Sequence, residues 1–522
     1  MNNDQTVSLK SHRSLQSYTK QFVACLVLQL AATFPVFIFV PPYIDDLGRS
    51  GQGYLNWSND GRPLADLLTA ALNNGTHLAL TSPLLQLLSL LFTAAAGTLL
   101  ARCFDVQKPW LGAACSLPIA AQPYFLENLS YRFDSVSMAA GLLLAVLCGL
   151  VIKENPKVNS LALSIPLAIG SLAFYQPVFY SIAVVAILGG VFMDCRAART
   201  GPRYNLLCPI ALALSTCVAS LIVYKYLLVG ILFQGRNVAY RSQDIGFGKH
   251  LPFALRNRIV EYWSLLSADW GTTLIGLLAL LILLSYVVSV LWTPRFWIPQ
   301  KLGHAAFRVL AALAVISTAH GPSLLLTRPL MELPRTMATL GVVFSCLLMH
   351  LLQTVTSGNN QSRLGFALRG WVYSLTSVFA YALIVNAYSY AAAFRAQNDY
   401  EMSVLTRLAY DIDKTADRVA HKNGVRVGFI GSLPASVTLK NSVKSYPYLK
   451  RIIPVLINGN WIWGGVKLAH VTGYAIDQVR LDNPEALSSR ITAMGVKPLF
   501  RSPLYQGYKI DDTLVIRFNS FP

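Results

Sequence analysis

The sequence predicts a polytopic α-helical membrane protein with a small α/β domain at its C-terminal end. Of its 522 residues, 54% are hydrophobic and 13% are charged, whereas soluble domains carry about 25% charged residues. The mean hydropathy is +0.48. Apolar runs such as 23–40 and 274–292 approach the ~20 residues that a helix needs to cross a bilayer. These runs are apolar on every side, so they do not fit a soluble helical protein.

Apolar stretches separated by polar breaks predict about eleven transmembrane helices. The stretches at 110–126 and 159–174 are short for a span, and leaving both out would lower the count by one pair. The predicted spans lie near 21–41, 81–101, 110–126, 136–152, 159–174, 178–193, 204–230, 270–292, 305–320, 337–355 and 370–393.

The basic residues of the loops orient these spans. The net charge is +19, but the cations stand in the gaps between apolar runs rather than in a stripe or tail, so we do not expect nucleic-acid binding. With the N-terminus inside, more Lys and Arg fall in inner loops than in outer loops, as cytoplasmic loops require. An odd number of spans then places the C-terminal segment on the outer side of the membrane.

The division of the chain follows from this topology. We expect a cytoplasmic N-terminus at 1–20, a transmembrane domain at 21–393 and a periplasmic α/β domain at 394–522. In the last of these, 399–421 has helical spacing, and 425–433 and 513–518 are typical of strands. The eight cysteines fall in spans or inner loops and have no metal-binding spacing, so neither a disulfide framework nor a metal site is expected.

The first outer loop, within 42–80, holds the strongest candidates for chemistry. Asp45 and Asp46 follow the first span directly and must face water, protein or a polar cavity. A pair of this kind can also be a solvated helix end. A long loop with charges of both signs and aromatic residues, in a membrane protein whose inner loops are mostly short, indicates a functional site. Its further candidates are Arg49, Trp57, Asp60 and Arg62.

Other outer segments add cations, aromatic rings and acids. Gln176 has the alternative interpretation of a helix-end cap, and Lys225, inside a predicted span, could extend its amine to the outer surface. An ion pair of Arg62 with Asp60 could simply shape the loop. The candidates from these segments are Tyr131, Arg132, Asp134, Gln176, Lys225, Arg241, Arg328 and Arg335.

This combination of residues suits a lipid-linked sugar. Arginine can hold an anionic phosphate with two hydrogen bonds, and Trp57 and Tyr131 can stack on sugar rings. One carboxylate can take the proton from an attacking hydroxyl group. The leaving group is already a phosphate and needs charge stabilisation rather than an acid. One base and several cations would therefore suffice, whereas glycoside hydrolysis uses two opposed carboxyl groups.

Several segments resemble a known family. The run YIDDLGRS…GYLNWSNDGRPLADLL, with ENLSYRFDSVSM and FYQP further on, is similar to the bacterial and phage O-antigen glucosyltransferases of the GtrII-like, serotype-converting group. The resemblance is close over residues 20–190 and looser beyond. The DDLGR and GRPL segments together are fairly specific, whereas either alone would be weak.

The resemblance implies a membrane glycosyltransferase of the GT-C type that works without a metal or other cofactor. Its expected donor is undecaprenyl-phosphate glucose, and its expected acceptor is the O-antigen of lipopolysaccharide at the periplasmic face. Asp45 or Asp46 would be the base of an inverting transfer, with Asp45 preferred, and Arg49, Arg62 and Arg132 would be candidates to hold the phosphate. A flippase or other transporter of lipid-linked sugars, and an O-antigen polymerase or ligase, are the alternatives.

Overall fold

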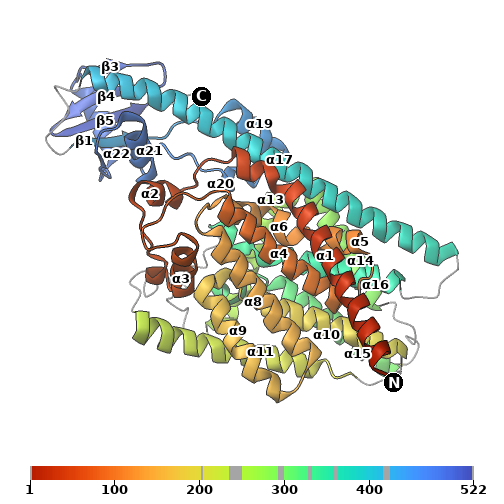
Figure 1. The fold of residues 1–522 in the computed structure, drawn as a ribbon. Coiled ribbons are helices and arrows are strands. Elements are labelled where there is room, and N and C mark those ends of the chain that lie inside the picture. The colour runs from red at the N-terminus through yellow and green to blue at the C-terminus, as the bar shows by residue number, and fades with distance from the viewer. Residues whose placement is uncertain are drawn as a thin grey trace. The chain divides into compact units, whose positions relative to one another are not determined.

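The computed structural model describes residues 3–200, 204–233, 250–291, 299–326, 332–356, 363–415 and 424–519. The chain forms two compact units. We call Met1–Ile38 with Tyr54–Tyr388 the membrane unit, and Phe39–Gly53 with Ser389–Pro522 the C-terminal unit. Figure 1 shows the helices of the first and the mixed sheet of the second.

Long apolar helices make up most of the membrane unit. Within the described residues, eight helices are long and apolar enough to cross a membrane, which makes this a helical membrane protein. The principal helices are α1 (Asn3–Phe39), α4 (Leu84–Cys103), α8 (Ser135–Glu154), α10 (Ser181–Thr200), α11 (Leu207–Ile222) with the π-helix η4 (Val223–Phe233), α14 (Leu274–Leu291), α16 (Thr339–Thr356) and α17 (Arg363–Lys414).

Shorter elements connect these helices. The helix α13 (Leu251–Trp270) was not predicted, because charged residues interrupt the apolar pattern of its sequence. The remaining elements are η1 (Trp57–Asp60), α3 (Pro63–Leu72), α5 (Pro109–Ser116), α6 (Pro118–Ala121), α7 (Pro123–Ser130), η2 (Val158–Ser160), α9 (Leu161–Phe174), η3 (Gln176–Val178), α15 (Pro299–Ser317), η5 (Gly321–Leu325) and η6 (Pro334–Met337).

The predicted number of spans is not confirmed. Each predicted range meets an apolar helix, but the helices at 109–121, 158–174 and 303–317 are shorter than the eight candidate spans. At 110–126 the reason is proline: Pro118 and Pro123 lack the backbone N–H that a continuing helix needs, so α5, α6 and α7 succeed one another as separate short helices.

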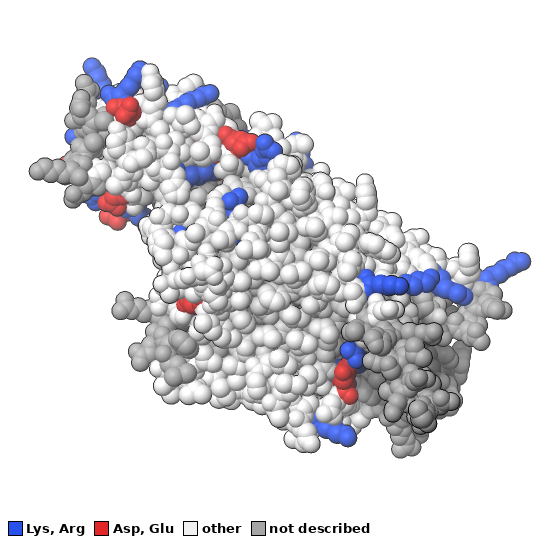
Figure 2. Space-filling model, viewed as in Figure 1, with Lys and Arg blue, Asp and Glu red and all other residues white. Residues whose placement is uncertain are grey.

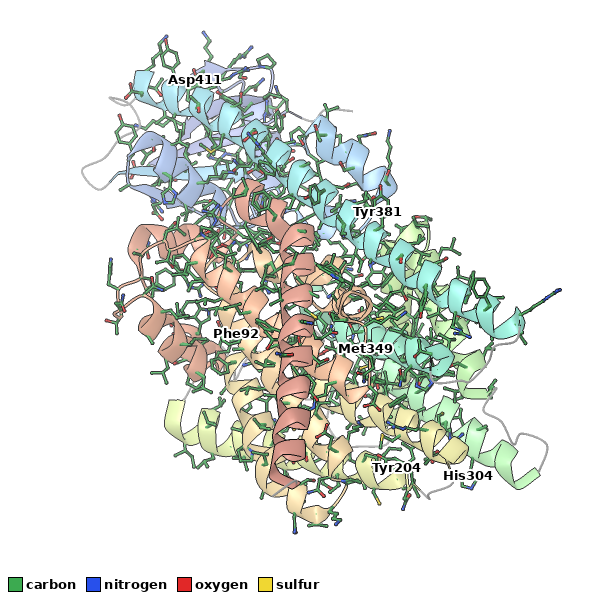
Figure 3. The ribbon with its side chains drawn as sticks, turned by 45° about the vertical axis from the view of Figure 1, so that its right-hand side comes forward. Phe92, Tyr204, His304, Met349, Tyr381 and Asp411 are labelled. Carbon is green, nitrogen blue, oxygen red and sulfur yellow. The ribbon has the colours of Figure 1, made fainter. Side chains whose placement is uncertain are left out.

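The centre of the membrane unit is built around α8 and α16. The helix α8 packs against α4, α9 and α10, and α16 packs against α10, α14 and α6. Met349 of α16 is fully buried, whereas Tyr381 of α17 is exposed (Figure 3). Figure 2 shows wide uncharged areas over the helices of this unit, as contact with lipid requires.

The C-terminal unit contains a five-stranded sheet of order β2-β1-β5-β4-β3. The strand β1 is parallel to β2 and β5, whereas β4 is antiparallel to β5 and β3. The predicted strands at 425–433 and 513–518 are confirmed as β1 and β5. The elements are α2 (Asp45–Gln52), β1 (Val425–Ile430), α19 (Val437–Ser445), α20 (Leu449–Ile452), α21 (Trp463–Thr472), β2 (Ile476–Gln478), α22 (Pro484–Ala493), β3 (Phe500–Arg501), β4 (Tyr505–Ile510) and β5 (Thr513–Phe518).

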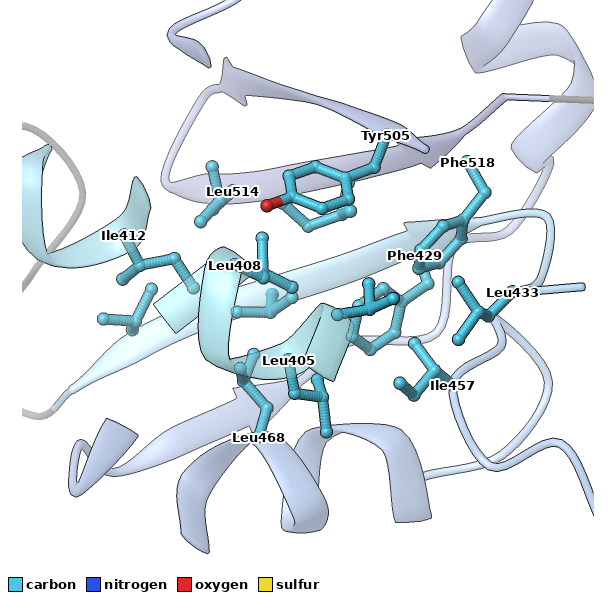
Figure 4. Close-up of a cluster of buried hydrophobic side chains, with 14 residues drawn as sticks. Leu405, Leu408, Ile412, Phe429, Leu433, Ile457, Leu468, Tyr505, Leu514 and Phe518 are labelled. Atoms are coloured by element: carbon cyan, nitrogen blue, oxygen red, sulfur yellow. The ribbon is translucent and has the colours of Figure 1, made fainter. Parts of the chain in front are cut away.

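Alternating side chains cover both faces of this sheet. Leu514 and Ile516 of β5 join the core cluster that contains Leu405 and Leu408 of α17 (Figure 4). Val515, between them in sequence, lies in the opposite cluster with Ile491 of α22. The two-residue period of a strand sends successive side chains to opposite faces, so β5 is buried on both sides.

The last part of α17 is tied to this sheet by buried polar groups. The helix runs without a break through residue 394, where the sequence indicated a domain boundary. Glu401 of α17 forms an ion pair with Lys467 of α21 at 2.8 Å, and both side chains are less than a tenth exposed. The other oxygen of Glu401 accepts hydrogen bonds from the backbone N–H of Leu456 and the amide of Gln397.

We predict that Lys467→Met lowers the free energy of unfolding of the C-terminal unit by about 3–5 kcal/mol, because it leaves the Glu401 carboxylate buried without its cation. Pulse proteolysis of the full-length protein in detergent measures the change. The matched control is Arg426→Met, which removes the cation of the exposed pair Arg426–Asp477 and should change stability by only about 0–1 kcal/mol. Equal effects of the two substitutions would contradict the prediction.

Candidate functional site

The fold of the loop between α1 and α4 depends on Asp66. The carboxylate of Asp66, in the first turn of α3, accepts hydrogen bonds from the backbone N–H groups of Asn56 (3.1 Å), Trp57 (3.0 Å) and Ser58 (2.7 Å). These donors stand at the start of η1 and have no helical partners of their own. Asp66 thereby folds η1 back against α3. The sequence showed Asp66 only as one of several loop acids.

Trp57 joins this loop to the start of α8. Its indole Nε1 donates a hydrogen bond to Asp134 Oδ1 at 2.6 Å. Trp57 is 1% exposed and packs with Ala65 and Phe133. Its ring is therefore part of the loop's own core here, and its predicted stacking on a sugar stays a prediction.

Gln176 connects three segments of the membrane unit. Its Oε1 accepts a hydrogen bond from Arg62 Nε (2.9 Å), and its Nε2 donates to the carbonyl oxygen of Asp60 (2.8 Å) and to the Tyr224 hydroxyl (2.7 Å). The Tyr224 hydroxyl donates in turn to the Gly61 carbonyl oxygen at 2.7 Å. Gln176 is thus more than a helix-end cap, because it fixes the turn that carries Arg62.

A second cation, Arg335, lies close by. Glu127 accepts a hydrogen bond from the Arg335 backbone N–H (2.8 Å) and pairs with its guanidinium at 3.4 Å. The guanidinium also donates to the Tyr131 hydroxyl and lies 4.9 Å from that ring's centroid. Tyr175 joins the two cations: its hydroxyl donates to the Arg335 carbonyl oxygen (3.3 Å), and Arg62 lies 4.8 Å from its ring centroid.

Burial moves the pKa of Tyr175 further above neutral pH. This residue lies just before the membrane-spanning segment Gln176–Ala198. Its burial raises the pKa to about 12, although the nearby positive charges of Arg335 and Arg62 act in the opposite direction. The phenol, which would be neutral at pH 7 even with its ordinary pKa, is a hydrogen-bond donor. We call Arg62, Gln176, Tyr175, Arg335, Glu127 and Tyr131 the arginine network.

The remaining candidates are placed less specifically. Arg132, which follows Tyr131 in the sequence, is half-buried. Lys225, which lies in η4, is also half-buried. Arg241 and Arg328 lie outside the described residues. Sequence reasoning did not select Glu127, Tyr175 or Tyr224, although the first two lie inside segments that it singled out.

Asp45 and Asp46 belong to the C-terminal unit, at the start of α2. Asp46 is fully buried, and its Oδ2 accepts a hydrogen bond from the Tyr43 backbone N–H at 3.0 Å. Asp45 is half-buried, and Arg49 is buried on the same helix. Tyr43 anchors this segment, since its hydroxyl donates to the Ile452 carbonyl oxygen at 3.0 Å. The two acids therefore differ in surroundings: Asp46 holds the turn, and Asp45 is more accessible.

The described residues contain no group of three or more His, Cys, Asp or Glu side chains that could hold a metal ion. Action without a metal stays an expectation.

Comparison with known sequences identifies the family. The model of the glucosyl transferase GtrII family matches residues 34–346. The chain belongs to this family. It is also 26% identical over 504 residues to an uncharacterized 55.3 kDa protein in the gtrB 5′ region of Salmonella phage P22, a match that covers 95% of this chain and 97% of the phage protein. The resemblance seen in the sequence is confirmed, and membership of the GtrII family supports glycosyl transfer in O-antigen modification.

We predict that Gln176→Leu lowers the rate of glucosyl transfer tenfold or more, since about 1.4 kcal/mol of lost transition-state stabilisation has this effect. The substitution removes the acceptor of Arg62 Nε and the donor to the Tyr224 hydroxyl, which keeps its bond to the Gly61 carbonyl oxygen. Transfer of radiolabelled glucose in membranes measures the rate. Gln107→Leu, which changes an exposed glutamine of the same unit, should leave transfer unchanged. A Gln176→Leu protein with wild-type transfer would show that the GtrII enzyme does not need this connection.

Proposed function

We propose that the protein transfers a glucosyl residue from undecaprenyl-phosphate glucose to the O-antigen of lipopolysaccharide. The reaction takes place at the periplasmic face of the bacterial inner membrane, in a GT-C type enzyme, with inversion at the anomeric carbon. The observation that carries this proposal is the arginine network in a member of a glucosyl transferase family. It gathers two guanidinium groups, two phenols, an amide and the carboxylate of Glu127 from segments far apart in the sequence.

The cations of the network fit the departure of a phosphate. When the bond between the anomeric carbon and the phosphate oxygen breaks, negative charge develops on the leaving polyprenyl phosphate. Arginine stabilises such charge through paired, charge-assisted hydrogen bonds, and donors already held in place lose little energy to reorganisation. In this proposal Arg62 and Arg335 hold the phosphate, with the tyrosines and Gln176 keeping their guanidinium groups oriented.

Asp45 is the proposed base. It takes the proton of the acceptor hydroxyl as the oxygen of that hydroxyl attacks the anomeric carbon from the face opposite the phosphate, which inverts the configuration. Asp46 is less suited to this task, because its Oδ2 is already bound to the Tyr43 N–H at 3.0 Å and its side chain is fully buried. The difference in burial supports the first acid of the pair over the second.

We predict that Asp45→Asn reduces kcat by about 10²–10⁴-fold, the usual contribution of a general base. Asp46→Asn should have a smaller effect, because an amide oxygen can still accept the hydrogen bond from Tyr43. Transfer of glucose from purified undecaprenyl-phosphate glucose to O-antigen measures both rates.

Each variant is compared with the wild type by fluorescence size-exclusion chromatography, which reports insertion and folding independently of activity. A well-folded Asp45→Asn protein that transfers glucose at the wild-type rate would exclude Asp45 as the base. A larger loss for Asp46→Asn than for Asp45→Asn would assign the role to Asp46.

A further inference from the structure

An apolar groove of about 270 Å³ lies among four helices of the membrane unit. The second half of α13 and the first half of α14 form one side, and the first half of α16 with the end of α15 forms the other (labelled in Figure 1). Its walls are almost entirely aliphatic and aromatic, with Leu266, Trp270, Leu283, Phe344 and Leu347 among them. Leu280 is 52% exposed, so the groove opens on the outer surface of the bundle.

The helix α16 connects this groove to the arginine network. Arg335 lies in η6, directly before α16, and the groove residues of α16 begin at Leu340. The segment between them consists of the end of η6 and the start of α16. Leu347, a further two turns along, continues the same wall. One helix therefore presents a cation near its start and an apolar wall after it.

The helix α7 provides a second connection. Tyr124 of α7 stacks on Trp270 of the groove with 5.5 Å between ring centroids, and its hydroxyl donates to Asp269 Oδ2 at 2.7 Å. One turn further along the same helix, Glu127 binds Arg335. Gly276 allows the tight turn between α13 and α14, because a Cβ atom there would lie 2.0 Å from the Trp270 carbonyl oxygen. One end of the groove therefore contacts α7, the same helix that binds Arg335 through Glu127.

We infer that this groove binds the polyprenyl chain of the donor, with the donor phosphate at Arg335; this inference rests on the proposed function. A ligand that fits both features has an anionic head and a long apolar chain. The head would meet the guanidinium, the first isoprene units would follow Leu340 and Phe344, and the chain would leave past Leu280 into the lipid. Burial of apolar chain in such a groove contributes affinity in proportion to the area covered.

The test compares two neighbouring leucines of α14 with two donors. Leu283 lines the groove, whereas Leu284 is 52% exposed and does not line it. Leu283→Trp should raise the KM for undecaprenyl-phosphate glucose about tenfold, which corresponds to displacing roughly two buried methylene groups. Its KM for citronellyl-phosphate glucose, whose chain has only two isoprene units and so covers much less of the groove, should change less, and both kcat values should stay near wild type. Leu284→Trp should match the wild type with both donors.

The outcomes separate this inference from the proposed function. Wild-type protein that transfers glucose from neither donor contradicts the proposed function. If the wild type is active but Leu283→Trp and Leu284→Trp have the same KM with the long donor, the groove does not hold the chain.

A photoreactive undecaprenyl phosphate gives a readout that does not depend on transfer. It should label peptides of α13, α14 or α16, and excess unlabelled undecaprenyl phosphate should prevent this. Equal protection by phosphatidylglycerol would make the groove a general lipid crevice, and cross-linked dimers in place of lipid adducts would assign it to a second copy of the chain. Either result overturns the inference.

Discussion

The hydrogen bonds of the Gln176 side-chain amide are the interaction on which the arrangement of the polar segments around Arg62 depends. A buried polar group left without a partner costs about 1–3 kcal/mol, and near a membrane little water is available to replace one. Gln176 satisfies Arg62 Nε, the Asp60 carbonyl oxygen and the Tyr224 hydroxyl together. A loop that could otherwise adopt many conformations is thereby given one, and Arg62 is held over the ring of Tyr175.

Periodicity and composition predicted the parts of this protein that depend on local sequence. The apolar run at 136–152 became α8, and the alternating segment at 513–518 became β5. The prediction of a span is not confirmed at 110–126, which prolines divide into three helices. It also missed α13, whose charges interrupt the apolar pattern.

The contacts of the site could not be read from the sequence in the same way. Glu127 and Arg335 are 208 residues apart, and no local pattern indicates that they meet. Trp57 was a candidate for stacking on a sugar, and its burial against Phe133 could not be seen in the sequence. Asp45 and Asp46 are adjacent in the sequence, but their different burial and the hydrogen bond from Tyr43 to Asp46 come from the fold. The residue types predicted the kind of chemistry, but only the tertiary packing shows which of these side chains contact one another.

The pairing of Glu127 with Arg335 restricts how this protein can change over evolution. Each charge is held largely away from water, at 3% and 17% side-chain exposure, so losing one partner leaves the other uncompensated at a cost of several kcal/mol. Substitutions at the two positions should therefore covary among relatives, with a neutral residue at one accompanied by a neutral residue at the other. A lineage that keeps only one of these charges would have to supply a new counterion from elsewhere.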